Sequence, residues 1–331
     1  MICTMNRPEA LARCLASLAA QTIPVGEVVV VHAGSDEHLA ETLRRIFAAA
    51  PFELKYLRSQ PSLVLQRNLG ITHSVGDVVF LLDDDVVLER HYVERILEVY
   101  GADVTGRIGG VQGSITNTAD PVWAGRWLRR LFQLTRAGPR GYLQPTGFPC
   151  HSYVVADRVE VELFSGCMMS FRRTLLEAHR FDERLKDRWW GDDWDLSYRV
   201  SREARLVQIP NARLVHDVAE SGRDSMRRMW RMMVVNHRYL YAKLLRSAGQ
   251  SWLPWVWAQV GLWLLAVMRA LTGRGFAALQ GMTEGFVDLL REPVGLDLRP
   301  RSGRPLDLTR EWSPRAGLPA QTKEEGTGRF E

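Results

Sequence analysis

Short apolar runs alternate with longer segments whose apolar residues recur at helical spacing through the first part of the chain. Strands are expected at 1–4, 28–31, 52–57, 78–82, 108–116, 159–164, 166–171, 206–209 and 212–215. Helices are expected at 9–20, 39–49, 63–72 and 90–100, and from residue 174. This rhythm predicts an α/β fold with a doubly wound parallel sheet. The first strand is short, so either it is clipped or the true start lies upstream.

The stretch 77–85 places three carboxylates at the end of an apolar run that reads as an interior strand of a parallel sheet. In open α/β sheets, ligands bind beyond the carboxyl ends of the strands. Because side chains alternate along a strand, Asp83 and Asp85 should point to one side and Asp84 to the other. Two carboxylates on one side suit a hard divalent cation, which in turn suits a diphosphate. The simpler interpretation is a solvated acidic loop that caps the next helix at Glu89.

The charge distribution argues against a protein devoted to binding nucleic acid. The chain of 331 residues has a formal net charge of +5 and a pI near 9.2, but its basic residues are unevenly spread and become denser after residue 200. This pattern predicts a local basic surface and no nucleic-acid partner. The four cysteines form no CxxC pair and are expected to be reduced, packed thiols. No apolar segment precedes Arg7, so no secretory signal is expected.

The region after residue 223 differs from the rest. From Ser225 to Arg246, arginines are interspersed with apolar residues at helical spacing, which favours an amphipathic helix at a membrane surface. The uncharged, tryptophan-rich segment that follows contains 252–268, which is long enough for a single transmembrane helix. The alternative is a helical layer that packs on the sheet domain with its arginines solvated.

These patterns divide the chain into three parts. Residues 1–222 form the α/β domain, with a less periodic insertion at about 117–160 that is a lid, a binding insertion or disordered. Residues 223–291 are C-terminal helices, expected to be membrane-associated. Residues 292–331, rich in Pro, Gly and charge, are expected to be an extended or disordered tail.

Six motifs occur between residue 1 and about residue 245 in the order found in one enzyme family. They lie at 4–8 with 14–21, and at 66–70, 80–85, 171–173, 181–183 and 191–196. On these motifs the chain resembles the family 2 glycosyltransferases. The resemblance implies the GT-A fold, a Rossmann-like doubly wound mixed sheet, here with a C-terminal helical extension. It also implies transfer of a sugar from a nucleoside-diphosphate sugar, with inversion at the anomeric carbon.

The resemblance also implies residues for the donor. Asp85 and Asp83 would ligate a divalent cation, Mn²⁺ or Mg²⁺, with Asp83 nearer the ribose or donor sugar. His216 matches a family histidine that completes the metal shell, which would favour Mn²⁺; the alternative is a strand-end histidine bonded to backbone. Arg67 would counter a phosphate, unless it is an ordinary helix-surface arginine. The residues expected to bind the donor are Thr4, Asn6, Arg7, Asp36, Arg67, Asp83 and Asp84.

For the acceptor side, the resemblance makes Asp193 the general base. The acid before it is Asp192, whose side chain is shorter than that of the family's usual Glu. This difference leaves open which role each of the two carboxylates has. A neighbouring carboxylate tends to raise one pKa toward that of a useful base, although either acid could instead cap a helix. Trp189 and Trp190 would stack on the acceptor sugar, or else belong to the core.

One departure concerns the nucleobase. The second strand ends in His32 and Ala33, where the family usually has an Asp that contacts the base. Either Asp36 reaches the base or its recognition differs, which leaves UDP, GDP and dTDP open.

We therefore expect a cytoplasmic enzyme, peripheral on the inner face of the cell membrane, that glycosylates a lipid-linked or cell-surface glycan in cell-envelope polysaccharide biosynthesis. A non-catalytic nucleotide-sugar-binding protein is the alternative, disfavoured because Asp83, Asp85, Asp193 and His216 are all present. A nucleotidyltransferase would need a Gly-rich, basic phosphate loop after the first strand, where this chain has Asn6-Arg7-Pro8.

Overall fold

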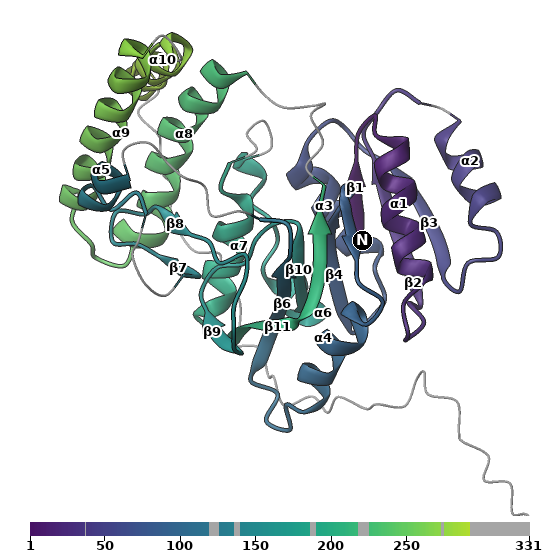
Figure 1. Cartoon of the computed structure of the whole chain (residues 1–331). Helices are drawn as coiled ribbons and strands as arrows, with labels where there is room; N and C mark the ends of the chain where they lie inside the picture. Colours follow the sequence, from purple (N-terminus) through teal and green to yellow (C-terminus); the bar gives the residue numbers. More distant parts are fainter. Residues whose placement is uncertain are drawn as a thin grey trace, which may run out of the picture.

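A mixed sheet of nine strands forms the centre of the part of the chain that the structure describes (Figure 1). This computed structural model describes residues 1–36, 38–118, 126–135, 140–185, 190–217, 225–272 and 275–291. The strand order is β3-β2-β1-β4-β10-β6-β11-β5, and β9 pairs with β11. Along the chain these strands are β1 (Ile2–Thr4), β2 (Glu27–His32), β3 (Glu53–Arg58), β4 (Val78–Asp83), β5 (Val86–Leu88), β6 (Ile108–Ile115), β9 (Val159–Val161), β10 (Met168–Arg172) and β11 (Arg205–His216).

Helices connect most of these strands. They are α1 (Pro8–Ala19), α2 (Leu39–Ile46), α3 (Leu63–His73), α4 (Tyr92–Gly101), α5 (Arg126–Leu131), α6 (Arg173–Ala178), the 3₁₀ helix η1 (Glu183–Leu185) and α7 (Asp192–Ser201). The C-terminal region adds α8 (Met226–Tyr241), the π-helical turn η2 (Ala242–Arg246), α9 (Leu253–Leu271) and α10 (Phe276–Arg291). A small second sheet pairs β7 (Tyr142–Leu143) with β8 (Pro149–Cys150).

Strand direction brings several carboxyl ends to one edge. β1, β2, β3 and β4 run parallel, and β10 is antiparallel to both β4 and β6. In register, Thr4 lies opposite His32 and Cys3 lies opposite Asp83, so β1, β2 and β4 end side by side. This edge is where an α/β sheet binds ligands.

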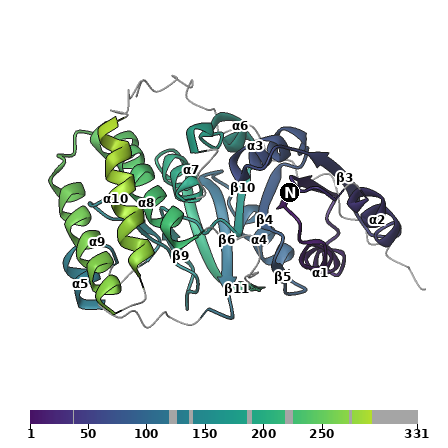
Figure 2. The ribbon, with the colours of Figure 1, turned by 90° about the horizontal axis from the view of Figure 1, so that it is seen from above.

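Two hydrophobic cores lie between the sheet and the helices that cover its two faces, and the view from above shows these helices on opposite sides of the sheet (Figure 2). One core packs α1, α2 and α4 against the sheet, and includes Leu11, Leu43 and Ile96. The other packs α3, α6 and α7 against the opposite face, and includes Ile71 and Leu175. The helices therefore cover both faces, which confirms the doubly wound mixed sheet.

A third core holds the C-terminal helices together beside α7 (Figures 1 and 2). It joins residues of α8, α9 and α10 to α5, a helix of the 117–160 insertion; among them are Leu128, Phe132, Val234, Leu262 and Met282. Among the described residues, α9 is the one helix long and apolar enough to cross a bilayer, with a mean hydropathy of 1.2. A third of that segment, 33%, is nevertheless buried inside the protein. Length and composition alone do not distinguish a membrane span from a packed helix.

Several element boundaries differ from the sequence predictions. The two strands expected at 206–209 and 212–215 are one strand, β11, which passes through an irregularity between Gln208 and Arg213 where its register against β6 shifts. Proline has no N–H for the ladder, so strands carry it at such irregularities, and Pro210 lies here. The helix expected at 39–49 ends at Ile46, and the strand expected at 159–164 ends at Val161. All four cysteines are buried free thiols, as expected. Trp189 and 292–331 lie outside the described residues.

Candidate active site

Three potential metal ligands meet at the carboxyl end of β4. Asp83 ends that strand, Asp85 lies in the turn before β5, and His216 ends β11, which pairs antiparallel with β5. One ligand atom from each of the three lies within 4.8 Å of the others. His216 Nε2 is 3.0 Å from Asp85 Oδ1. The fold thus brings together the carboxylates and the histidine that the sequence predicted as ligands.

The middle acid, Asp84, points to different partners. Its two oxygens accept hydrogen bonds from Thr4 Oγ1 at 2.7 Å and from Arg7 Nη1 at 3.2 Å. Burial raises the pKa of Asp84 to about 6, although these two donors oppose the shift. Arg7 Nη1 also lies 3.4 Å from Asp85 Oδ2. Asp84 therefore fastens the loop after β1 to the end of β4, and the direct contact of Thr4, Arg7 and Asp84 with a donor stays a prediction.

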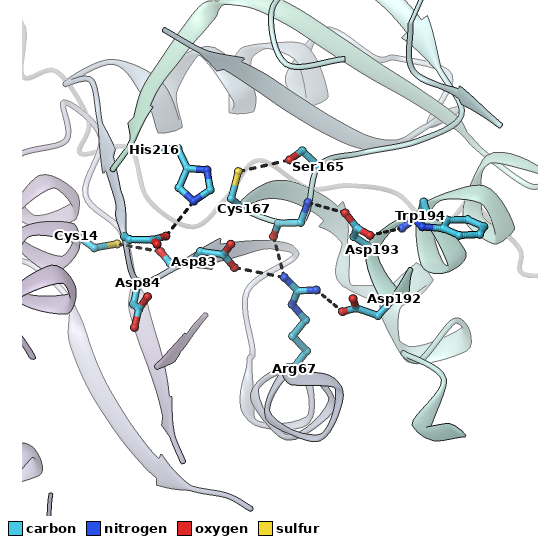
Figure 3. A network of polar contacts seen from close by, with 12 residues as sticks. Cys14, Arg67, Asp83, Asp84, Ser165, Cys167, Asp192, Asp193, Trp194 and His216 are labelled. Atoms are coloured by element: carbon cyan, nitrogen blue, oxygen red, sulfur yellow. Dashed lines mark hydrogen bonds and ion pairs between the residues drawn. The ribbon is translucent and has the colours of Figure 1, made fainter. Parts of the chain in front are cut away.

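Arg67 of α3 is a buried cation between the two halves of the site (Figure 3). Its Nη1 lies 2.5 Å from Asp192 Oδ2, and its Nη2 lies 3.4 Å from Asp83 Oδ1 and donates to Gly166 O at 3.0 Å. Burial alone would lower the pKa of Arg67, but the carboxylates of Asp192 and Asp83 raise it above its ordinary value. Arg67 is thus a permanent positive charge that joins the end of β4 to the start of α7.

The two acids at the start of α7 have different environments. Gly191 precedes them at φ 104°, a backbone conformation that favours glycine, and an added Cβ would meet Leu240 Cδ1 at 2.4 Å. Asp192 is buried, and burial raises its pKa to about 6 even though Arg67 opposes the shift. Asp193 is partly exposed, and its Oδ2 accepts a hydrogen bond from Gly166 N at 3.1 Å. Asp192 is therefore held in a buried ion pair with Arg67, whereas Asp193 is accessible to solvent.

Gly166 is a site residue that the sequence did not single out. Its carbonyl accepts from Arg67 and its N–H donates to Asp193, so one peptide segment connects the two side chains. A Cβ at Gly166 would lie 3.0 Å from Arg67 Nη2. The available signal was the small pair Ser165-Gly166 just before β10, which had no obvious packing role.

The end of β2 forms the other border of the site. His32 is buried, and its Nδ1 lies 2.6 Å from the hydroxyl of Tyr56. Asn6, at φ 56°, accepts at Oδ1 a hydrogen bond from the N–H of Ser35. Asp36 is exposed and accepts from His38 N at 2.9 Å. These contacts hold the loops after β1 and β2 together, and contact of Asn6 or Asp36 with a nucleotide stays a prediction.

Trp190 lies in an aromatic cluster next to α7. Its ring centroid is 5.5 Å from that of Trp194, 5.8 Å from that of Phe148 and 6.2 Å from that of His237. Asn236 Nδ2 of α8 donates to Trp190 O at 2.7 Å. The cluster is compatible with both sequence interpretations of Trp190, because the side chain is only partly buried.

Polar contacts thus run from Asp83 through Arg67 and Gly166 to Asp193 at the carboxyl edge of the sheet, and the pair of His216 and Asp85 lies beside Asp83 (Figure 3). At one end, two carboxylates and a histidine form a donor set that suits a divalent cation. At the other end, Asp193 is a partly exposed carboxylate fixed by backbone N–H groups. Such an arrangement can hold a cationic group beside a leaving anion and a separate base beside a nucleophile.

Comparison with known proteins identifies the family. The sequence model of Glycosyl transferase family 2 matches residues 1–179. The uncharacterized glycosyltransferase YwdF of Bacillus subtilis is 24% identical over 229 residues, which are 67% of this chain and 74% of that protein. The succinoglycan biosynthesis protein ExoM of Rhizobium meliloti is 28% identical over 162 residues, which are 47% of this chain and 50% of that protein.

A solved structure shows the same fold. The mannosyltransferase PcManGT from Pyrobaculum calidifontis, in complex with GDP-Man and Mn²⁺, is 18% identical with a TM-score of 0.51, and the match covers 87% of this chain and 85% of that one. This likeness supports a GT-A fold for the mixed sheet described above. Because the family model matches more than half of the sequence, this protein is a glycosyltransferase that belongs to glycosyl transferase family 2.

Proposed function

We propose that this glycosyltransferase moves a sugar, with inversion, from a nucleoside-diphosphate sugar to a hydroxyl of a lipid-linked or cell-surface glycan. One observation carries the proposal: the cluster of Asp83, Asp85 and His216 is connected through Arg67 and Gly166 to Asp193. Single displacement needs a stabilised leaving group and a base on the opposite side of the reacting carbon. The two ends of this network offer those two functions.

The donor end would hold the diphosphate. Asp83, Asp85 and His216 fit a divalent cation because their ligand atoms converge and two of the three are carboxylates. A bound Mn²⁺ or Mg²⁺ would supply charge neutralisation for the departing diphosphate. PcManGT was solved with GDP-Man and Mn²⁺, which supports a nucleotide-sugar donor and favours Mn²⁺ here. Asn6, Arg7 and Asp36 would bind the nucleoside part, with UDP, GDP and dTDP as the candidates.

The acceptor end would supply the base. Asp193 takes the proton of the acceptor hydroxyl while the hydroxyl oxygen bonds to the anomeric carbon of the donor sugar. In the same step the bond between that carbon and the nucleoside diphosphate breaks. We assign the base to Asp193 and not to Asp192, because Asp192 is buried and paired with Arg67 at 2.5 Å. Asp192 instead positions α7, and Trp190, with Trp189 outside the described residues, would stack on the acceptor sugar.

The similarity to ExoM, a succinoglycan biosynthesis protein, supports a role in polysaccharide synthesis at the cell envelope. Such acceptors are carried at a membrane, so we place the enzyme at the cytoplasmic face of the cell membrane and assign the contact to the helices of 223–291.

A thermal-shift panel of UDP, GDP, dTDP and their sugars, with and without Mn²⁺, tests the donor. A ligand that binds only the folded state raises its apparent stability, so the nucleotide giving the largest Mn²⁺-dependent shift names the donor. The enzyme should also hydrolyse the sugar of that nucleotide donor or transfer it to an acceptor. A clear shift with no turnover on any acceptor would favour the non-catalytic binding protein. No shift with any nucleotide would contradict the proposal.

A further inference from the structure

Helix α9 presents an apolar stripe to solvent. Six side chains at intervals of three or four residues lie on one face, with exposed fractions from 39% at Val267 to 82% at Leu271. This α9 stripe consists of Leu253, Val256, Val260, Leu264, Val267 and Leu271. The opposite face of the helix is buried in the third core. An exposed contiguous apolar face of this kind marks an interaction surface.

Helix α5 extends the stripe sideways. The indole N–H of Trp257 donates to Leu131 O at 2.9 Å, and its ring centroid lies 4.6 Å from that of Phe132. Trp127 and Leu131, one turn apart on α5, are 67% and 52% exposed. Both views show α5 and α9 together at the end of the molecule away from α1 and α2 (Figures 1 and 2).

The charged residues of the two helices that form this surface are all basic. The described segments 126–135 and 247–272, which contain α5 and α9, carry arginines and no Asp or Glu. Arg129 of α5 and Arg269 of α9 lie near enough to interact electrostatically, and Arg130, the next residue of α5, is exposed. A basic border around an apolar face complements a bilayer with anionic headgroups.

The acidic residues of the C-terminal helices α8, α9 and α10 are paired with arginines of α8. On α10, Glu284 accepts from Arg227 Nε at 2.8 Å and Asp288 accepts from Arg231 Nε at 2.6 Å, both arginines of α8. The basic helix at 225–246 that the sequence suggested as the interfacial element thus has two of its arginines paired with α10. Much of its surface is also buried, as at Trp230.

Packing argues against α9 as a membrane span. Gln259 Nε2, on the buried face of α9, donates to His237 Nδ1 at 2.7 Å. Gly261 packs against Phe132 so closely that a Cβ added at Gly261 would lie 2.3 Å from Phe132 Cβ. A spanning α9 would have to abandon these contacts. A second copy of the chain is also disfavoured, because two arginine-bordered faces without acids would repel each other.

We propose that the α9 stripe, with Trp127 and Leu131 of α5, is a docking surface that lies in the plane of a bilayer containing anionic phospholipids. The role of this docking surface, to hold the active site near a membrane-borne acceptor, rests on the proposed function.

The test is sedimentation of the full chain with vesicles of phosphatidylcholine alone or mixed with phosphatidylglycerol. The wild type should bind the mixed vesicles far better than the neutral ones, and salt should weaken this binding. The double variant Val260→Ser/Leu264→Ser should bind about tenfold more weakly or worse, from lost apolar contact. The matched control Val75→Ser/Val104→Ser changes two exposed valines of the sheet domain and should bind like the wild type.

Charge is tested separately. Arg130→Gln should weaken binding to the mixed vesicles about fivefold, the effect of one basic residue near an anionic surface. Arg45→Gln on α2, also exposed, is its control and should have no effect.

Four results would overturn the docking proposal: no vesicle binding by the wild type, equal losses in the variants and their controls, resistance to carbonate extraction from membranes, or a wild-type dimer that the stripe variant dissociates. Donor hydrolysis in vesicle-free solution separates this inference from the enzymatic proposal, because the stripe variant should keep wild-type hydrolysis. Vesicle binding as described, with no hydrolysis by any of these proteins, would count against the proposed function and leave the docking surface intact.

Discussion

Replacing Arg67 with methionine should destabilise the fold by about 3 kcal/mol at about pH 8 and by clearly less at about pH 5. The change removes the partner of Asp192, which is only 3% exposed, and the donor to Gly166 O. Removing one member of a buried ion pair costs about 3–5 kcal/mol. We expect the lower end, because Asp192 can take up a proton: its pKa is about 6 beside Arg67 and should be higher without it. Below about pH 6 the carboxyl is protonated in both proteins, so the difference shrinks.

Urea unfolding of wild type and variant at the two pH values measures this difference. Arg95→Met is the matched control, because Arg95 and Glu98 form an exposed pair at 3.3 Å on α4. Its loss should be below about 0.5 kcal/mol at either pH. A loss below about 1 kcal/mol for Arg67→Met, or one that is equal at both pH values, would refute the role of Arg67 as the partner of a buried carboxylate.

Three further predictions concern the contacts that α8 and the following turn η2 make with the sheet domain. Lys243 lies 2.7 Å from both Asp182 and the buried Asp195, so Lys243→Met should cost about 2–4 kcal/mol, and an unchanged thermal midpoint would contradict this. Burial would raise the pKa of Asp182, but Lys243 and a hydroxyl donor lower it to about 2. The ionised Asp182 therefore stabilises the fold by about 2 kcal/mol above about pH 4, and this contribution should be lost as the pH falls toward 2. An acid-unfolding series would measure the loss. Asn236→Leu removes the donor to Trp190 O and should lower kcat about tenfold without changing donor KM, whereas unchanged kcat would show that this bond does not position the loop before α7.

Local patterns predicted the fold because the relevant signals are local. Buried β-branched runs such as that in β2 and the helical spacing in α1 specify their own elements, and alternation of the two specifies the layers. The prediction of two strands for β11 was wrong because Pro210 reads as a break, and only the neighbouring strands show that pairing resumes beyond it.

The convergence of the candidate metal ligands was predictable from the sequence, but the contacts that join them to the start of α7 were not. Alternation along the strand favoured a shared side for Asp83 and Asp85, and their ligand atoms do converge with that of His216. Nothing local indicated that Arg67 would pair with Asp192, 125 residues away. Such pairing depends on where α3 and α7 stand against the sheet, which no short stretch of sequence specifies.

The C-terminal helices show a related effect. Basic residues on α8 suggested a membrane surface, yet Arg227 and Arg231 face acids on α10, which is 57 residues further along. An amphipathic pattern identifies the polar face of a helix, but the tertiary packing decides whether that face meets solvent, lipid or a neighbouring helix.

Comparison of Asp193→Asn with Asp85→Asn in one experiment, measuring donor binding with Mn²⁺ and transfer of the sugar in a single turnover, tests the central claim most directly. If a cation site at Asp85 and a separate base at Asp193 share one reaction, Asp193→Asn binds the donor like the wild type and transfers no sugar, while Asp85→Asn loses the Mn²⁺-dependent part of donor binding. Near-wild-type transfer by Asp193→Asn, or Mn²⁺-dependent donor binding that is unchanged in Asp85→Asn, would contradict it.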